Sequence, residues 1–470
     1  MRKTKIICTI GPASENRETL VQMCHAGMNV ARLNFSHGTH EEHQAKIDLI
    51  KSVREELDIP LAIMLDTKGP EYRIGTFVNG KAEVNTGDKF TFVCDDIVGD
   101  NTRCTVNYKE LAKCLSVGDR VLVNNGLVIF EVSEIQGADV ICDVVCGGIL
   151  SNRKSMCFPN KVMNGPYLSE QDKADILFGI QNDIDFIAAS FVSNEKDMIE
   201  LTKFLKANGG SDIGVIAKIE NRAGIENVEA ICKHCCGIMV ARGDLGVEIP
   251  FIELPAVQKQ LIATCRHLGK RVIVATEMLE SMIQNPRPTR AEISDVANAV
   301  YDSASAIMLS GESAAGKYPV EAVKNMAEIA EFTENSINYN KRFNAYDFSI
   351  RSTQDALSHA TCSMAIDVHA KAIVACTTSG STAMMVSRFR GPVDIVGMTT
   401  NKKAWRQLAL SWGVIPVLSD EFNSMDVMFY HAMICAKKAL PLQEGDKVVM
   451  TGGPMNGQSG NTNTIKVEIV

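Results

Sequence analysis

Charged and hydroxyl side chains recur in this sequence directly after short apolar runs. A single one of these residues could be a solvated loop charge or half of an ion pair. Their repeated appearance at the same end of successive runs instead indicates one shared site. The residues are Arg32, Asn34, Ser36, His37, Asp66, Lys68, Glu71, Arg73, Lys218, Glu220, Arg242, Asp244, Thr276, Glu277, Glu312 and Ser313.

Two sets of oxygen ligands can be separated among these residues and Thr67, which follows Asp66. Glu220 and Asp244 end neighbouring runs, and two hard carboxylate ligands with open positions suit Mg²⁺, which keeps water and substrate oxygens in its shell. The second set offers neutral and singly charged oxygens, which suits a larger monovalent cation, although ordinary loop capping is the preferred interpretation of that set taken by itself. That set is Asn34, Ser36, Asp66 and Thr67.

Arg32 and Lys218 bring positive charge to the same group of residues. Arginine can grip phosphate with two parallel hydrogen bonds, and lysine acts as a compact point charge. The Gly-Asp pair in ARGDLG (241–246) opens a helical stretch, and free N–H groups at a helix start bind carboxylate or phosphate. Residue types alone therefore predict a metal-dependent enzyme that acts on a small phosphorylated or carboxylated anion, through phosphoryl transfer or enolate stabilisation.

Eight apolar, β-branched runs must position these side chains. Continuously apolar strands that alternate with helical stretches predict a parallel sheet covered on both faces, and eight such units predict a closed (β/α)₈ barrel. In such a barrel the active site lies at the carboxyl ends of the strands, where the charged residues fall. The runs span residues 5–12, 29–38, 61–70, 185–193, 214–221, 237–244, 271–278 and 306–313.

The spacing of the runs divides the chain into three parts. The barrel is predicted for residues 1–70 and 168–343. Residues 71–167 show alternating hydrophobicity and frequent turn signals, which predicts a small inserted all-β domain, a β-barrel that could act as a lid. Residues 344–470 alternate helices with strands and predict a separate open α/β domain, after a polar boundary stretch at 335–349.

Composition excludes several classes of protein. The 470 residues carry a net charge of −8, which argues against nucleic acid as a partner. No apolar stretch is long enough to span a membrane or resembles a signal peptide. The 15 cysteines are scattered, which predicts reduced thiols in a cytoplasmic protein. In HGTHEEH (37–43) only His37 belongs to a run end, and His40 and His43 are expected on a solvated helix face.

Longer motifs resemble the pyruvate kinase family in order and spacing over the whole chain. They are CTIGP (8–12), RLNFSHG (32–38), LDTKGPE (65–71), AKIEN (217–221), MVARGDLGVEIP (239–250), NPRPTRAE (285–292) and MLSGES (308–313). The resemblance implies a (β/α)₈ barrel with an inserted β domain and a C-terminal α/β domain. It implies transfer of the phosphoryl group of phosphoenolpyruvate to ADP, giving pyruvate and ATP at the end of glycolysis.

The resemblance also implies roles for individual residues. Arg32 would contact the phosphoryl group, and Lys218 would neutralise it in transfer together with the enolate left behind. Glu220 and Asp244 would hold Mg²⁺ or Mn²⁺. The substrate carboxylate would bind the backbone amides of Gly243 and Asp244 and the Thr276 hydroxyl.

Further roles are implied for the rest of the group. A proton would reach the enolate near Thr276 through water organised with Glu312 and Ser313. The nucleotide phosphates would meet Asn34, His37, Arg73 and Lys154. K⁺ would bind Asn34, Ser36, Asp66 and Thr67. In this family a Glu after LDTKGP accompanies K⁺ dependence, whereas a Lys there supplies a built-in ammonium, so Glu71 predicts K⁺ activation.

The chain departs from the family pattern at four places. They are the hinge VNNGL (123–127), Ser193, the segment KSMCFPN (154–160) in place of KGVNLPG, and DSASA (302–306). None of them removes a metal ligand or Lys218, so an active enzyme is expected.

A regulatory site and two competing functions complete the predictions. Hydroxyls and a glycine between a strand and a helix form a candidate phosphate nest for a sugar-phosphate effector, fructose 1,6-bisphosphate first. The residues are Thr377, Thr378, Ser379, Gly380, Ser381 and Thr382. The family implies a homotetramer. The alternatives are a metal-dependent lyase or aldolase using pyruvate-enolate chemistry, and a catalytically silent scaffold protein.

Overall fold

A computed structural model describes residues 2–124, 126–161, 165–453 and 461–470 of the chain. Eight parallel strands close into a barrel, with β1 paired to both β2 and β17. Every predicted run forms one of them, because the apolar residues are buried on both faces. The strands are β1 (Lys5–Thr9), β2 (Val30–Asn34), β3 (Ala62–Asp66), β13 (Phe186–Ala189), β14 (Gly214–Ile219), β15 (Gly237–Ala241), β16 (Arg271–Ala275) and β17 (Ala306–Leu309).

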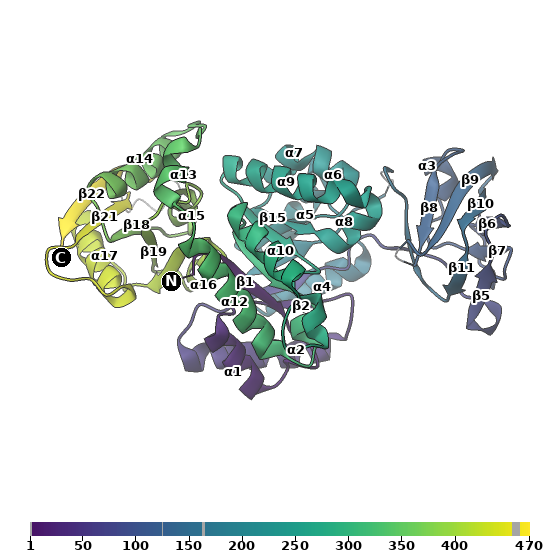
Figure 1. Cartoon of the computed structure of the whole chain (residues 1–470), viewed down its shortest axis with the longest axis horizontal. Helices are drawn as coiled ribbons and strands as arrows, with labels where there is room; N and C mark the ends of the chain where they lie inside the picture. The colour runs from purple at the N-terminus through teal and green to yellow at the C-terminus, as the bar shows by residue number, and fades with distance from the viewer. Residues whose placement is uncertain (1, 125, 162–164, 454–460) are drawn as a thin grey trace.

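Helices surround the barrel and cover its outer face (Figure 1). Several begin at reciprocal capping boxes, as at Thr39 with Glu42 and Thr289 with Glu292, so local sequence fixes where they start. The main core lies between strands and helices, and a smaller core fills the barrel interior. The helices are α1 (Arg17–Ala26), α2 (His40–Leu57), α4 (Glu170–Gln181), α5 (Glu195–Ala207), α6 (Arg222–Glu226), α7 (Val228–Cys232), α8 (Arg242–Glu248), α9 (Leu254–Leu268), α10 (Arg290–Tyr301), α11 (Gly311–Ala314) and α12 (Pro319–Asn335).

The inserted segment forms an all-β unit at one end of the molecule (Figure 1). Its own core is built on Phe90, Phe92 and Phe130. The main sheet has the order β4-β12-β8-β9-β10-β6-β7, and an isolated bridge between Ile74 and Val106 joins the segments that follow its two edge strands. The elements are β4 (Tyr72–Arg73), β5 (Lys81–Val84), β6 (Lys89–Val93), β7 (Arg103–Thr105), α3 (Leu111–Cys114), β8 (Arg120–Val123), β9 (Val128–Gln136), β10 (Asp139–Cys146), β11 (Gly148–Ser151) and β12 (Ser155–Cys157).

The C-terminal segment is an open sheet with the order β20-β19-β18-β21-β22 and helices on its faces. Strand β20 was not predicted, because Pro416 interrupts its apolar pattern; proline is tolerated here since the strand lies at the sheet edge. The elements are α14 (Thr353–Asp367), β18 (Ala372–Cys376), α15 (Ser381–Ser387), β19 (Asp394–Thr399), α16 (Lys402–Leu408), β20 (Val414–Leu418), α17 (Met425–Ala439), β21 (Lys447–Gly452) and β22 (Thr464–Ile469).

The stretch 335–349, predicted as a polar boundary, contains helix α13 (Tyr339–Ala345). Phe343 of this helix packs into the C-terminal core, so the helix belongs structurally to the C-terminal unit. On the same side, Leu410 enters the barrel core, and Arg406 donates to the buried carboxylate of Asp185 at 2.6 Å. The C-terminal unit therefore caps the amino end of the barrel strands, opposite the inserted domain.

Candidate functional site

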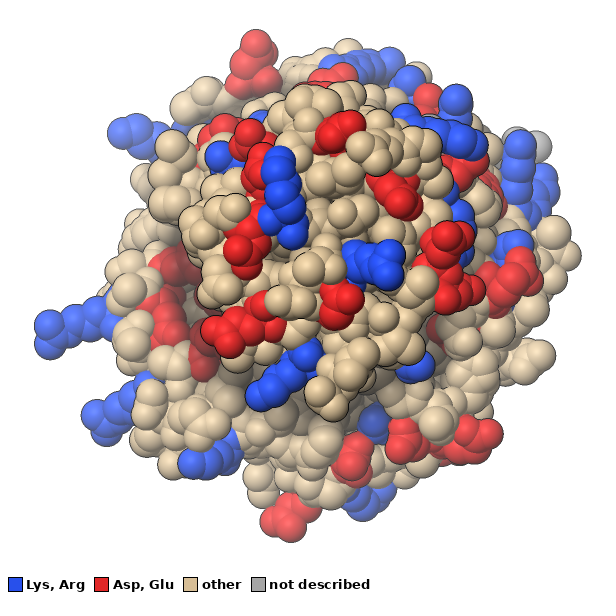
Figure 2. All heavy atoms as spheres, turned by 90° about the vertical axis from the view of Figure 1, so that its right-hand side faces the viewer, with Lys and Arg blue, Asp and Glu red and all other residues tan. Residues whose placement is uncertain are grey.

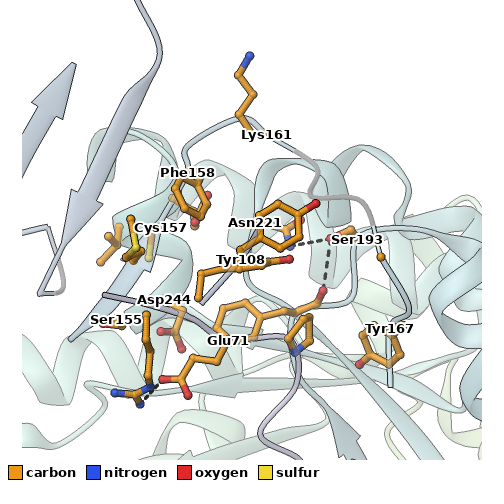
Figure 3. Close-up of a pocket in the computed structure, with 18 of the residues that line it drawn as sticks. Glu71, Tyr108, Ser155, Cys157, Phe158, Lys161, Tyr167, Ser193, Asn221 and Asp244 are labelled. Atoms are coloured by element: carbon orange, nitrogen blue, oxygen red, sulfur yellow. Dashed lines mark hydrogen bonds and ion pairs between the residues drawn. The ribbon is translucent and has the colours of Figure 1, made fainter. Parts of the chain in front are cut away.

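A cleft of about 960 Å³ lies between the barrel and the inserted domain. Tyr108, Cys157 and Phe158 of the inserted domain face Asp244 and Asn221 of the barrel across it (Figure 3). The cleft opens at the carboxyl ends of the barrel strands, because the insertion leaves the barrel just after β3 and returns before α4. Closing this cleft would exclude water from whatever binds there.

Lys218, at the end of β14, is the centre of a buried charged network in the barrel mouth. Its Nζ lies 3.0 Å from Asp66 Oδ1, 3.0 Å from Glu220 Oε1 and 2.7 Å from Ser190 Oγ. Asp66 also accepts a hydrogen bond of 2.7 Å from Nε of Arg32. The structure thus brings Arg32 and Lys218 into one network, with Asp66 as the link between them.

Burial and neighbouring charges set the protonation of this network. Burial raises the pKa of Glu220 to about 7, and Asp244 adds a like charge that works in the same direction, while Lys218 opposes both. Burial alone would lower the pKa of Lys218, but the carboxylates of Asp66 and Glu220 outweigh it and raise the pKa above its usual value. Lys218 is therefore held as a cation in a largely water-free position.

A divalent cation fits the two carboxylates predicted to hold it. Glu220 is fully buried, and among the described residues its Oε1 has no hydrogen-bond partner, although it forms an ion pair with Lys218. A second positive charge between Glu220 and Asp244 would offset both the burial of Glu220 and the repulsion between the carboxylates. Among described residues no group of three or more His, Cys, Asp or Glu could hold a metal ion. Water and substrate would have to complete the shell.

The four residues predicted for K⁺ come from the ends of two paired strands. Asn34 and Asp66 are directly opposite each other in the β2–β3 register. Asn34 Oδ1 accepts from the backbone N–H of Ser36 at 3.2 Å, and the Thr67 carbonyl accepts from Ser190 Oγ at 2.6 Å. The charge of Asp66 is already paired with Arg32 and Lys218, which leaves the neutral oxygens of Asn34, Ser36 and Thr67. Such a set suits a monovalent cation.

Thr276 follows β16 and lies against the first turn of α8. The backbone N–H of Gly243 donates to Thr276 Oγ1 at 2.8 Å, so the residues predicted for the substrate carboxylate are in contact. Thr276 has φ of 68°, a left-handed conformation that a β-branched residue rarely adopts. Such backbone outliers concentrate at functional sites.

Glu312 and Ser313 are fully buried in the short helix α11, which follows β17. Glu312 accepts from the backbone N–H groups of Leu279, at 3.0 Å, and Ser310, at 2.7 Å. Ser313 Oγ donates to the Thr9 carbonyl at 2.9 Å. These bonds join the turn after β17 to β1 and to the segment that follows Thr276.

The residues predicted for the nucleotide fall into two groups. His37, Arg73 and Lys154 line the cleft, whereas Asn34 is not part of its wall. Arg73 forms an ion pair with Glu71 and donates to the Arg153 carbonyl. The hinge VNNGL includes Asn125, which lies outside the described residues.

Sequence reasoning missed the contribution of the fourth strand. Ser190, after β13, binds Lys218, and the backbone N–H of the next residue, Phe191, donates to Glu220 Oε2 at 2.6 Å. A hydroxyl at a strand end was the available signal, but the run carries no charged residue at its carboxyl end. The φ of 55° at Phe191, which aims that N–H, is not visible in a sequence.

The prediction for His43 was wrong, because this side chain is 3 % exposed and stacks on Phe35 with ring centroids 3.8 Å apart. His40 is half-buried against Phe178 and bonds Asp175 at 2.6 Å. Both rings therefore hold the turn after β2 against helices α2 and α4 rather than facing solvent.

The candidate phosphate nest spans the loop after β18 and the first two residues of α15. Gly380 has φ of 84°, which glycine tolerates and which starts the helix. Gln354 donates to Ser381 Oγ at 2.8 Å, and the hydroxyls of Thr382 and Thr462 are 2.7 Å apart. The glycine-rich loop at 452–462 reaches the nest through Thr462, and its residues 454–460 lie outside the described part of the chain.

Comparisons with known proteins agree along the full chain. A family model described as "Pyruvate kinase, barrel domain" matches residues 1–323, and one described as "Pyruvate kinase, alpha/beta domain" matches residues 355–468. Pyruvate kinases of Clostridium acetobutylicum and Clostridium perfringens are 47 % and 44 % identical to this chain, with 100 % of each chain covered. That of Geobacillus stearothermophilus is 45 % identical over 100 % of this chain and 80 % of its own. A crystal structure of a pyruvate kinase from Cryptosporidium parvum matches with a TM-score of 0.94 and 35 % identity, covering 100 % of this chain and 96 % of that one.

Proposed function

The chain belongs to the pyruvate kinase family, and from that premise we propose that its cleft transfers the phosphoryl group of phosphoenolpyruvate to ADP in the last step of glycolysis. The observation that carries the proposal is the buried Lys218 cation, held by Asp66 and Glu220 beside Arg32 at the barrel mouth. A fixed positive charge in a poorly hydrated site stabilises charge that moves during phosphoryl transfer.

Substrate would bind along the rim between β2 and β16. Arg32 contacts the phosphoryl group, and the N–H groups of Gly243 and Asp244 with the Thr276 hydroxyl hold the carboxylate. The short Gly243–Thr276 contact supports this, because one anion could bridge both groups. Lys218 then neutralises the phosphoryl group in transfer and the enolate oxygen that remains.

Proton delivery to the enolate carbon is assigned to the surroundings of Thr276. Glu312 and Ser313 fix the neighbouring turns, which supports a role in organising water at this side of the site. Neither side chain reaches solvent, so both act through the groups that they hold.

Two cations complete the proposed site. Glu220 and Asp244 hold Mg²⁺ or Mn²⁺, and Asn34, Ser36, Asp66 and Thr67 hold K⁺. When bound, the divalent ion supplies positive charge that polarises substrate oxygens and neutralises developing charge. The raised pKa of Glu220 supports its assignment as a metal ligand. Burial makes its negative charge costly, and a bound metal ion would compensate that charge as a proton does.

ADP and ATP would occupy the cleft on the inserted-domain side. Arg73 and Lys154 from that domain and His37 from the barrel supply positive and hydrogen-bonding groups for the nucleotide phosphates. Asn34, outside the wall of the cleft, is kept as a fourth contact on the resemblance alone. The lyase or aldolase alternative is not supported, because the family and the named relatives are pyruvate kinases.

ATP formation tests the proposed activity. Purified protein with phosphoenolpyruvate, ADP, Mg²⁺ and K⁺ should form ATP, monitored by reducing the released pyruvate with lactate dehydrogenase and NADH. A folded sample that forms no ATP, or that releases pyruvate equally well when ADP is left out, would contradict the proposal.

A sugar phosphate, fructose 1,6-bisphosphate first, is proposed as an effector at the nest formed by residues 377–382. The hydroxyls of Ser381 and Thr382 and the left-handed Gly380 support a phosphate-binding turn. Phosphoenolpyruvate saturation curves measured with and without the bisphosphate test it, and identical curves would argue against an effector role.

A homotetramer in the cytoplasm is proposed as the working form. Exposed apolar side chains gather on α17, at Val427, Tyr430 and Ile434, and on β22, at Val467 and Ile469, which supports a self-association surface. Sedimentation velocity measures the assembly directly. The described residues contain no disulfide and no helix that is long and apolar enough to cross a membrane.

Nucleic acid is not proposed as a partner. On the face shown in Figure 2, lysine and arginine alternate with aspartate and glutamate instead of gathering into a basic patch. The net charge of −8 agrees with this distribution.

A further inference from the structure

Two consecutive residues after β16 have left-handed backbone conformations without being glycine. Thr276 has φ of 68° and Glu277 has φ of 54°. Neither residue type favours this region, and a β-branched threonine least of all. The surrounding structure must therefore hold this turn, which presents the Thr276 hydroxyl to the site.

Arg242 supplies the restraint. Its Nε and Nη2 donate to the Thr276 carbonyl at 3.1 and 2.6 Å, and Nη2 also donates to the Glu277 carbonyl at 2.9 Å. The guanidinium is nearly buried, so these bonds are not competed away by water. One planar group thus grips both strained peptides at once.

The guanidinium is itself oriented from the opposite side. Nη1 of Arg242 binds both carboxylate oxygens of Asp295, on α10, at 2.9 and 2.7 Å. Both oxygens contact the same nitrogen, so Asp295 holds one corner of the guanidinium while Nε and Nη2 bind the carbonyls on the other side. With all three nitrogens engaged, the plane of the group is fixed. The negative charge of Asp295 also compensates the positive charge of the buried Arg242.

The position of Arg242 in the chain gives this contact a functional meaning. It is the first residue of α8, directly before Gly243 and Asp244. The same side chain therefore ties the helix start that would bind substrate carboxylate and metal to the turn that carries Thr276. The Gly243 N–H donates to Thr276 Oγ1 at 2.8 Å, so the start of α8 and the turn after β16 are in direct contact.

We propose that Arg242 is a positioning residue for the reaction, that it holds Thr276 and the start of α8 in register, and that Asp295 orients it. The inference rests on the proposed function, since Thr276 matters only if substrate binds there. Lysine cannot replace the guanidinium, because an ammonium has one nitrogen and cannot reach two adjacent carbonyls on one side and the Asp295 carboxylate on the other.

The test compares Arg242→Lys with the full-length parent protein. A misplacement of about 1 Å costs on the order of 100-fold in rate, so kcat should fall about 100-fold. KM for ADP should stay within about twofold, because His37, Arg73 and Lys154 line another part of the cleft. Exchange of solvent deuterium into the methyl group of pyruvate, measured by proton NMR with Mg²⁺, K⁺ and ATP present, should fall at least as far as kcat.

Two further variants keep the test decisive. Asp295→Asn leaves Arg242 in place but loosens its orientation, and should lower kcat and deuterium exchange by about tenfold; it carries the test if Arg242→Lys does not fold. The control is Arg17→Lys, because Arg17 also begins a barrel helix and its side chain contacts Ser52 and Glu56 on α2. It should retain parental kcat.

The outcomes separate the two proposals. A parent protein that forms no ATP defeats the proposed function. In the other case the parent is active, and the folded Arg242→Lys and Asp295→Asn variants match its kcat and exchange rate while only their melting temperatures are lower. That result would show that the contact is only structural and would overturn this inference.

Discussion

Replacing Lys218 with methionine should remove most phosphoryl transfer while leaving the barrel folded. Methionine keeps the length of the side chain but removes the ammonium that lies 3.0 Å from both Asp66 and Glu220. A unit charge about 4 Å from a transferring phosphoryl group contributes about 4 kcal/mol at an effective dielectric constant near 20. That corresponds to about a 1,000-fold lower kcat, whereas KM for ADP should change little.

The cost in stability should be smaller than for most broken buried pairs. Asp66 keeps Arg32 as a partner. Glu220 loses its cation, but its pKa is already about 7, so a proton can neutralise it instead. We therefore expect a loss of about 2 kcal/mol in unfolding free energy, below the roughly 3–5 kcal/mol of a stranded buried charge.

The pH dependence follows from the sign of the Glu220 shift. A carboxyl whose folded pKa is raised binds its proton more tightly in the folded state, so stability falls as pH rises from the unfolded value toward the folded one. For the parent this window closes near pH 7. Without Lys218 the folded pKa rises further, so the variant should keep losing stability between pH 7 and 8.

Coupled assays of ATP formation measure kcat, and urea unfolding at pH 6, 7 and 8 measures stability. Lys173→Met is the matched control, because Lys173 pairs with Glu170 on the surface of α4 and lies outside the site. A Lys218→Met protein that retains more than a tenth of parental kcat would refute the reasoning that its charge stabilises the transition state.

Three further outcomes test other parts of the structure. Glu71→Lys should make activity independent of K⁺, since the ammonium takes over the charge of the ion, while Glu71→Gln should stay K⁺-dependent in the same assay; equal K⁺ responses of the two variants would disprove this. Glu248 accepts hydrogen bonds from the Cys157 thiol and the next backbone N–H, and burial raises its pKa to about 7. Through this carboxyl the parent should lose about 1–2 kcal/mol of unfolding free energy as pH rises from 5 to 8, a figure lowered because the side chain is partly exposed. Glu248→Gln should abolish that loss, and the same pH slope in urea unfolding of parent and variant would count against it. Arg406→Leu removes the closer of the two arginines paired with the buried carboxylate of Asp185, while Arg54 stays 3.8 Å away. The loss in unfolding free energy should be about 2–3 kcal/mol, below the roughly 3–5 kcal/mol of an uncompensated buried charge, and a melting temperature equal to the parent's would exclude this contact as a main link between barrel and C-terminal domain.

The strands of the barrel were predictable because each is a continuous apolar run followed by polar residues. That pattern is local and needs no knowledge of neighbours. It fails where the determining contact is distant. The run with Pro416 was missed because its acceptance depends on lying at a sheet edge, and His43 was assigned to solvent because nothing local shows that Phe35 stacks on it.

Residue types and their order along the chain determined the composition of the site. Lys218, Glu220, Asp244 and Thr276 could be named from their places after apolar strands, and the family followed from the same motifs. Each of these is a property of a short segment, since one strand end and the turn after it suffice to define it.

Only the tertiary structure decided how these groups share their partners. Asp66 serves both Arg32 and Lys218, and Arg242 grips the carbonyls after β16, because barrel closure brings the ends of strands that are distant in sequence within hydrogen-bond reach. Burial in that mouth then raises the pKa of Glu220. Desolvation and contact across strands depend on the whole fold, so no segment of the sequence contains them.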